Sequence, residues 1–545
     1  MKRLLATCLL TTLLVSCGNK EPEASTQTSV DQNLIRAHLE FLADDLLEGR
    51  DTGSRGYELA AHYVEKEFTK IGLSPAGDEG SFQQRVPFRK TYLNQQTTNA
   101  VIEIDGKKVT LDYPEQYMMG GSANSAHTAV SAKAVFVGYG LVAEEFDYND
   151  YEGLDVKGKI VVSLSGRPTS WPSEEGAHLA SSKEKKRYAA ERGAVGFVTL
   201  HTPKREKVRS YTTSLNYLRV PSMKWLNSNN EPFGEYKQLK GGAYFNLSAG
   251  KVLFENAEQS LEEIFQLDTD DKPIKGFPLN ATLSLAKDSR HEEVSAPNII
   301  AVLPGSDPKL KDEYVVFTAH LDHIGFAQDV TKKDRINNGA MDNASGVSVL
   351  LETARVLSKS NPRRSILFTV VAAEEKGLLG ANYFTNNPTI PLNQMVANIN
   401  LDMPVLLYDF ADIIAFGANH STMGDIVEQA AGQLGIGLSP DPMPQQAIFT
   451  RSDHYNFVKK GIPSVFLMTG FKSKTEGEDG GKVWGDFFAN HYHQPSDSLD
   501  LPINYNAAEM FADVNIRIGL AVANSDDKPK WLPESFFGRT FSSSK

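Results

Sequence analysis

Cysteine is almost absent from this chain of 545 residues: only Cys8 and Cys17 occur. The chain beyond residue 17 therefore has no thiol that could form a disulfide, attack a substrate or bind a metal. Positively charged residues are also fewer than negatively charged ones: 56 lysines and arginines against 68 aspartates and glutamates give a net charge of −12. An acidic protein repels phosphate backbones, so we expect no nucleic-acid partner.

The N-terminal apolar run is too short to span a membrane. It covers residues 4–15, about a dozen positions, whereas the hydrocarbon core of a bilayer is about 30 Å thick. It ends in Leu14-Val15-Ser16-Cys17, which resembles a bacterial lipobox. We therefore expect a signal peptide over residues 1–16, an acylated Cys17 that anchors the exported chain to a membrane of the cell envelope, and a flexible tether over 17–30. An ordinary secretory signal with a chance cysteine is the alternative.

The rest of the chain has the composition of a globular protein, with 41% hydrophobic residues overall. Apolar residues at helical spacing predict two helices between Asp31 and Gly72. Strands are predicted in the middle of the chain, which we interpret as a β-rich unit of its own over residues 119–288. They cover residues 133–140, 157–164, 194–200, 244–253 and 277–286.

From about residue 296, runs of valine, isoleucine and phenylalanine alternate with helical segments. This pattern predicts an α/β fold with a mostly parallel sheet flanked by helices on both faces. The strands are expected over residues 298–303, 314–319, 365–372 and 395–401. We expect residues 31–118 and 289–545 to be two parts of this domain, with the β-rich unit inserted between them.

Polar side chains follow three of these predicted strands at the point where each strand ends. His320 follows one strand, Glu374 and Glu375 follow the next, and Asp402 follows the third. Parallel strands end at the same edge of a sheet, where open α/β sheets place their ligand sites. The sequence therefore predicts a site at this edge.

Two further candidates lie in loops. Asp342 lies in a loop of small residues that opens a helix, and His493 lies in a late loop without a periodic pattern. Imidazole and carboxylate donors without sulfur suit catalytic zinc. Charge favours two ions over one, because Asp342, Glu375 and Asp402 bring three negative charges, and two zinc ions with one hydroxide balance them.

Each candidate alone also has a structural interpretation. Glu374 and Glu375 could stabilise a helix start, Asp342 could cap a helix, and Asp402 could belong to a turn. Their shared position at successive strand ends favours the site. Structural roles are expected for His323, His420, His454 and His491, and a solvated helix face is expected for the charged residues 183–187.

Six stretches resemble the co-catalytic zinc aminopeptidases, a family that also includes glutamate-carboxypeptidase-like enzymes. They are HLDHIG (320–325), GAMDNASG (339–346), AAEEKGLLG (372–380), NLDM (400–403), SDH (452–454) and HQPSDS (493–498). The resemblance implies hydrolysis of peptides from their N-terminus with two zinc ions per chain. It also implies that residues 119–288 are a protease-associated domain that shapes substrate access.

The same resemblance implies a role for each matching residue. Asp342 would bridge the two metals, Glu375 and His493 would complete one site, and His320 and Asp402 the other. Glu374 would be the general base, and Asp322 would be the carboxylate that orients His320.

One position departs from the family pattern: Phe449 stands where some relatives carry an oxyanion-stabilising tyrosine, and Arg451 or Tyr455 could substitute for it. Three rival functions share these residues: a carboxypeptidase or dipeptidase, a glutaminyl cyclase with a single zinc, and an inactive receptor-like module. The last is disfavoured, since all five ligands and Glu374 are present. The sequence leaves the oligomeric state open.

Overall fold

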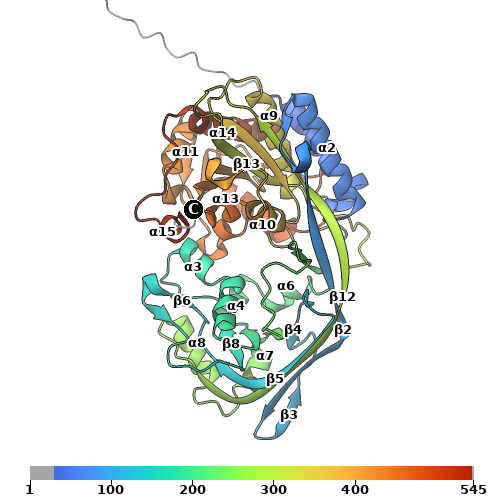
Figure 1. The fold of residues 1–545 in the computed structure, drawn as a ribbon, viewed down its shortest axis with the longest axis vertical. Helices are drawn as coiled ribbons and strands as arrows, with labels where there is room; N and C mark the ends of the chain where they lie inside the picture. Colours follow the sequence, from blue (N-terminus) through green and yellow to red (C-terminus); the bar gives the residue numbers. More distant parts are fainter. Residues whose placement is uncertain (1–29, 543–545) are drawn as a thin grey trace, which may run out of the picture.

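The computed structural model describes residues 30–542, so the predicted signal peptide, Cys17 and nearly all of the tether lie outside the described residues. In the described part, two lobes share one 16-stranded sheet (Figure 1). Two long strands, β2 (Gln83–Ile104) and β12 (Phe277–Leu303), run along one side of the molecule and join the lobes. They pair antiparallel from Gln83 with Ile299 to Ile104 with Ala281. No helix between residues 30 and 542 has the length and apolar character needed to cross a bilayer.

The upper lobe in Figure 1 is built on four parallel strands, in the spatial order β18 (Ser464–Thr469), β15 (Met395–Leu401), β13 (Tyr314–His320) and β14 (Ser365–Val371). Successive side chains of a strand point to opposite faces. Val315 and Phe317 accordingly pack into one apolar core and Val316 into another, so both faces of the sheet are covered. The predicted α/β fold, a mostly parallel sheet flanked by helices, is confirmed.

Helices cover the two faces of this sheet. On one face α9 (Gly346–Leu357) packs against α14 (Tyr505–Asn524) and α1 (Gln32–Leu42), and on the other α10 (Leu379–Asn386) packs against α12 (His454–Val458). The two predicted N-terminal helices are confirmed. The second, α2 (Arg55–Ile71), begins where Ser54 accepts a hydrogen bond from the Tyr57 N–H and ends at Gly72, whose φ of 91° is the left-handed conformation that glycine adopts without strain.

The lower lobe has apolar cores of its own around the parallel strands β5 (His127–Phe136), β8 (Ile160–Leu164), β9 (Gly196–Leu200) and β11 (Gly241–Phe245). Helix α4 (Ser182–Glu191) and two shorter helices, α3 (Ser173–Leu179) and α6 (Tyr211–Leu215), face the upper lobe (Figure 1). The expected boundary between residues 288 and 289 falls inside β12, and the division into domains stays a prediction.

One predicted strand of the lower lobe was wrong, and another was predicted correctly but too short. Most of residues 244–253 form α7 (Leu247–Leu253), because the Asn246 side chain accepts hydrogen bonds from two backbone N–H groups and caps a helix. Residues 277–286 are only the first part of β12, whose 27 residues also include the separately predicted strand at 298–303. The remaining longer elements are β10 (Ser222–Trp225), β16 (Asp412–Phe416), α5 (Pro203–Val208), α8 (Leu261–Thr269), α11 (Met423–Gly432), α13 (Gly480–Asn490) and α15 (Phe536–Phe541).

Candidate metal centre

The parallel strands of the upper lobe bring their ends together at one edge of the sheet. His320 is the last residue of β13, Glu374 and Glu375 follow the end of β14, and Asp402 directly follows β15. β13 pairs in parallel with both neighbours, so the three ends lie side by side. The result is a distance of 3.0 Å between His320 Nε2 and Asp402 Oδ1.

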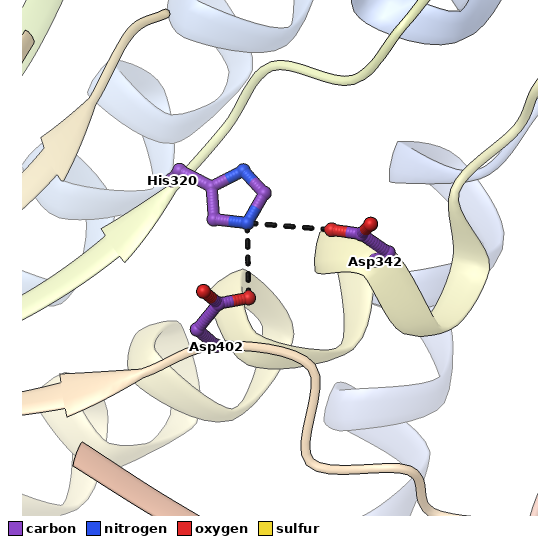
Figure 2. A group of neighbouring side chains, drawn as sticks. All are labelled: His320, Asp342 and Asp402. Atoms are coloured by element: carbon purple, nitrogen blue, oxygen red, sulfur yellow. Dashed lines mark hydrogen bonds and ion pairs between the residues drawn. The ribbon is translucent and has the colours of Figure 1, made fainter. Parts of the chain in front are cut away.

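Asp342 lies between the two halves of the cluster. It belongs to a helical turn, η4 (Ala340–Ser345), directly before α9. Its carboxylate points toward His320 (Figure 2), with Oδ1 3.4 Å from His320 Nε2, and its Oδ2 lies 3.2 Å from His493 Nε2. The tight turn depends on Gly339, where a Cβ would stand 2.1 Å from the main-chain oxygen of Asp342. One carboxylate thus faces both imidazoles.

Glu375 and His493 complete the second half. Glu375 Oε2 lies 3.2 Å from His493 Nε2, which makes His493 equidistant from its two carboxylate neighbours. The structure therefore brings together all five residues predicted as ligands: His320, Asp342, Glu375, Asp402 and His493.

The separations between donors fit zinc. Two ligands of a tetrahedral zinc ion with bonds of about 2.0–2.1 Å are roughly 3.3–3.4 Å apart. The four imidazole-to-carboxylate separations of the predicted ligands are 3.0, 3.4, 3.2 and 3.2 Å. The donors form two sets that share Asp342, which is the arrangement expected for two neighbouring ions.

A further histidine, His323, lies beside Glu375 and His493 in the second half of the ligand cluster. His323 is fully buried, and its Nδ1 lies 2.8 Å from Glu375 Oε1 and 3.9 Å from Asp342 Oδ2. With Asp342 and Glu375 it forms a group whose donor atoms could hold one ion. Sequence reasoning gave His323 a structural role, and its position three residues after His320 was the available signal. His493 fits the zinc separations better, because both of its distances match.

The electrostatics of the cluster reflect this gathering of carboxylates. Burial lowers the pKa of His320, but Asp402, Glu374 and Asp342 outweigh that effect and hold it well above its ordinary value. Burial raises the pKa of Glu374 well above its ordinary value, and neighbouring carboxylates, chiefly those of Asp402 and Asp453, add to the rise. Carboxylates this close repel one another, so the cluster calls for positive charge.

Asp322 holds the segment that carries Glu374 and Glu375. Its carboxylate accepts hydrogen bonds from the Glu374 N–H at 3.0 Å and the Glu375 N–H at 3.3 Å. His320 Nδ1 is hydrogen-bonded to the main-chain oxygen of Asp322 at 3.1 Å, whereas the carboxylate Oδ1 of Asp322 is 3.9 Å away. The residue as a whole thus fixes both the imidazole and the glutamate pair.

Two supporting residues were missed by sequence reasoning. The guanidinium of Arg50 is fully buried and donates to main-chain oxygens of Leu42, Leu321, Asn338 and Gly339, which ties the segments that carry His320 and Asp342 together. The second, Asp497, accepts hydrogen bonds from the backbone N–H groups of Met341 and Asp342. Its place inside the HQPSDS stretch was the only signal for it.

The lower lobe contributes one hydroxyl to the site. Tyr217 Oη, which follows α6, lies 3.3 Å from His493 Nδ1, the ring nitrogen that faces away from the carboxylates. Of the two predicted substitutes for the missing tyrosine, Tyr455 has its Oη hydrogen-bonded to His178, and the exposed Arg451 donates a hydrogen bond to the main-chain oxygen of Gln446. Phe449 is buried among aromatic rings. No sequence signal identified Tyr217.

The other residues singled out in the sequence lie outside the ligand sets. His454 is fully buried, and burial lowers its pKa to about 3. His420 pairs with Glu174 of the lower lobe at 2.6 Å, and His491 contacts Ser496. Ser452 supports the site, since its hydroxyl donates to Asp402 Oδ2 at 2.5 Å.

Comparison with known proteins gives a family match for the segment that carries these ligands. Residues 298–518 match the model of Peptidase family M28. The curated relatives include a "probable leucine aminopeptidase 2" of Aspergillus oryzae, 26% identical over 49% of this chain and 56% of that protein, and Aminopeptidase YwaD of Bacillus subtilis, 28% identical over 44% of this chain and 47% of that protein. The chain thus spans about half the length of these relatives.

A solved structure resembles the whole fold. The aminopeptidase from Aneurinibacillus sp. strain AM-1 superposes with a TM-score of 0.53 at 20% sequence identity, and the match covers 92% of this chain and 95% of that one. At this identity the likeness establishes the fold, including the presence of both lobes, and nothing about the substrate.

Proposed function

We propose that the chain is a zinc-dependent aminopeptidase that binds two zinc ions, and that residues 298–518, which match the model of Peptidase family M28, carry the activity. His320 and Asp402 would hold one ion, Glu375 and His493 the other, and Asp342 both. The relatives named as aminopeptidases support this activity.

The observation that carries the proposal is the position of Asp342. Its two oxygens lie 3.4 Å and 3.2 Å from histidine nitrogens that belong to different halves of the cluster. A single-zinc site needs no such shared carboxylate. The geometry therefore favours a two-metal hydrolase over a glutaminyl cyclase with one zinc.

Two zinc ions, when bound to these residues, would supply an activated nucleophile, because zinc lowers the pKa of bound water from 15.7 towards about 7, and would polarise the scissile carbonyl. Glu374 is then the proton carrier. Its carboxylate lies beside the ligands and takes a proton as the nucleophile attacks, then delivers it to the leaving amine. Asp322 keeps Glu374 and Glu375 in place through their backbone N–H groups. Tyr217 and the main-chain oxygen of Asp322 fix the two imidazole rings.

The anchoring and the role of the lower lobe belong to the same proposal. We propose that the chain is exported and attached to the cell envelope through acylated Cys17, and that residues 119–288 act as a protease-associated domain that shapes access to the zinc site. Detergent phase partition tests the anchor. The full chain should enter the detergent phase, whereas a Cys17→Ser variant should remain in the aqueous phase.

A substrate panel tests the activity itself. Leucyl-p-nitroanilide, its N-acetylated form, a peptide with a blocked N-terminus and a free C-terminus, and a glutaminyl peptide are incubated with the chain lacking residues 1–17, with and without a chelator. We expect release of p-nitroaniline only from the substrate with a free N-terminus, loss of activity on chelation and recovery with zinc. Activity that resists chelation, residues released from the C-terminus, or cyclisation of the glutaminyl peptide without hydrolysis would contradict the proposal.

A further inference from the structure

A large cavity adjoins the candidate zinc site. Its volume is about 1500 Å³, and its wall comes from both lobes: α4 and β10 of the lower part, and α10 and α12 of the upper part. Tyr217 lines it and at the same time contacts His493, so this side chain touches both the cavity and a predicted metal ligand. Gly377 and Leu378, two and three residues after Glu375, also line it.

The charge of the cavity is opposite to that of the chain. Seven lysines and one arginine line it, against a single carboxylate from Glu235, although the chain as a whole carries a net charge of −12. A concave surface of one sign focuses its field and attracts ligands of the other sign.

Several of these lysines have no anionic partner. Lys183 and Lys186, on one face of α4, form no ion pair with any described carboxylate, and neither does Lys459 on the opposite wall. Lys287 donates only to the main-chain oxygen of Gly120. By contrast, Lys224 is paired with Glu235 at 3.1 Å. The sequence interpretation of residues 183–187 as a merely solvated face therefore misses that Lys183 and Lys186 face this cavity.

The lowered pKa values of two of these lysines show that burial and neighbouring lysines destabilise their charged form. Burial lowers the pKa of Lys459 to about 7; Lys183 and Lys460 lower it further, and Glu184 opposes them. Burial also lowers the pKa of Lys287 to about 8, and Lys186 adds to the effect. An anion in the cavity would relieve this repulsion.

We propose that the cavity binds the carboxylates of acidic peptide substrates, on the side of the scissile bond that leaves. This inference rests on the proposed aminopeptidase function. An aminopeptidase substrate has a single residue before the scissile bond, so the rest of the peptide must lie on the leaving side. An extended chain advances about 3.3 Å per residue, and residues a few positions beyond the bond therefore reach past Tyr217 into the cavity. The volume exceeds the roughly 300–1000 Å³ of a small-molecule site and leaves room for several residues.

Three matched peptides test the proposal: Leu-Ala-Glu-Glu-Glu-amide, Leu-Ala-Gln-Gln-Gln-amide and the glutamine peptide with a free C-terminal carboxylate. We expect kcat/KM for the glutamate peptide to exceed that for the glutamine amide by about tenfold at low salt, and the ratio to shrink as salt screens the charges. A gain for the free-acid peptide alone would assign the cavity to the terminal carboxylate. Equal rates for all three peptides would overturn the proposal.

A double variant tests whether the cavity lysines cause the preference for glutamate over glutamine peptides. Lys183→Gln with Lys186→Gln should bring the glutamate-to-glutamine ratio close to one, and Lys459→Gln alone should lower it in the same direction. The matched control is Lys107→Gln with Lys108→Gln, which removes the same charge from exposed positions on β3 (Lys107–Thr110) that do not line the cavity. The control should keep the wild-type ratio. A ratio that survives the first variant, or falls equally in the control, would contradict the proposal.

Binding measured without hydrolysis separates this inference from the proposed function. The fluorescence anisotropy of labelled, N-acetylated glutamate and glutamine peptides is followed as the full chain is added. If the chain hydrolyses no peptide but binds the glutamate peptide about tenfold tighter, binding of acidic peptides in the cavity stands, and its assignment to the leaving side of a scissile bond falls with the aminopeptidase proposal. If the chain cleaves leucyl peptides yet binds both ligands equally, the inference falls and the activity stands.

Discussion

Two neighbouring regions of this molecule gather charges of opposite sign. At the end of the parallel sheet, carboxylates gather around His320 and His493, whereas on the far side of Tyr217 lysines gather around an open cavity. Both gatherings are unfavourable by themselves, because like charges in a partly buried place repel one another. Each therefore indicates a missing counter-charge: divalent cations at the sheet edge and, in our proposal, the carboxylates of the substrate in the cavity.

The two regions also differ in how they are built. The metal ligands stand at the ends of buried strands or in turns fixed by Arg50 and Asp497. The cavity wall is made of loops, short helices and strand edges from both lobes. Rigid support suits donors that must keep separations near 3.3 Å, and a looser wall suits peptides that vary in sequence.

The largest expected effect is at the residue that both halves of the metal site share. Asp342→Asn removes a charge that faces both His320 and His493, so we expect fewer than two zinc ions per chain and a fall in kcat/KM on the order of 10³-fold or more. Metal analysis of the purified variant and hydrolysis of leucyl-p-nitroanilide measure the two effects. An Asp342→Asn variant with two zinc ions and near-normal activity would refute the role of this residue.

The next largest effect distinguishes Glu374, the proposed proton carrier, from the metal ligands. Glu374→Gln keeps every metal ligand, so the zinc content should be unchanged while kcat falls by roughly 10²–10⁴-fold. Glu375→Gln is the matched comparison on the adjacent residue and should lose zinc as well as activity. Equal zinc loss in both variants would show that Glu374 is a ligand and not the base.

Tyr217 tests the boundary between the two regions. Tyr217→Phe removes the hydroxyl that lies 3.3 Å from His493 Nδ1 but keeps the ring of a residue that lines the cavity. We expect a loss of about tenfold in zinc affinity or activity, the lower end for a residue that orients a metal-binding histidine. Tyr211→Phe, whose hydroxyl bonds to the main-chain oxygen of Pro114, serves as the control in the same segment. Identical behaviour of the two variants would rule out an orienting role.

The smallest effect concerns pH. Lys459 and Lys287, with pKa values lowered to about 7 and about 8, carry their charge below those values and lose it above them. The preference for glutamate over glutamine peptides should therefore decline severalfold between pH 6 and pH 9. Taking the ratio of the two rates at each pH cancels the pH dependence of the chemical step. A ratio that is constant or rises with pH would contradict the assignment of these lysines to the cavity's charge.

The sequence predicted the metal region far better than the cavity, for a physical reason. His320 and Asp402 could be placed because buried parallel strands have a strong pattern and a fixed end. The contact of Tyr217 with His493 joins positions 276 residues apart through an irregular segment that has no periodic pattern. The supporting role of Arg50 could not be predicted either, since its hydrogen-bond partners are main-chain oxygens, which every residue has.

The lower lobe shows the same limit. The apolar runs at β8 and β9 were predicted correctly, but β2 and the full length of β12 were not, because their alternation changes where the strands pass from one lobe to the other. The basic stretch at residues 183–187 was visible in the sequence. What could not be seen was that Lys459, from a different lobe, faces the same cavity.

The most direct test of the central claim is the zinc stoichiometry of activity. The chain is stripped of metal, zinc is added in steps, and bound zinc and leucyl-p-nitroanilide hydrolysis are measured on the same samples. The shared position of Asp342 predicts that binding saturates at two zinc ions per chain and that full activity requires both. Full activity at one zinc ion per chain, or at none, would contradict a site in which one carboxylate serves two ions.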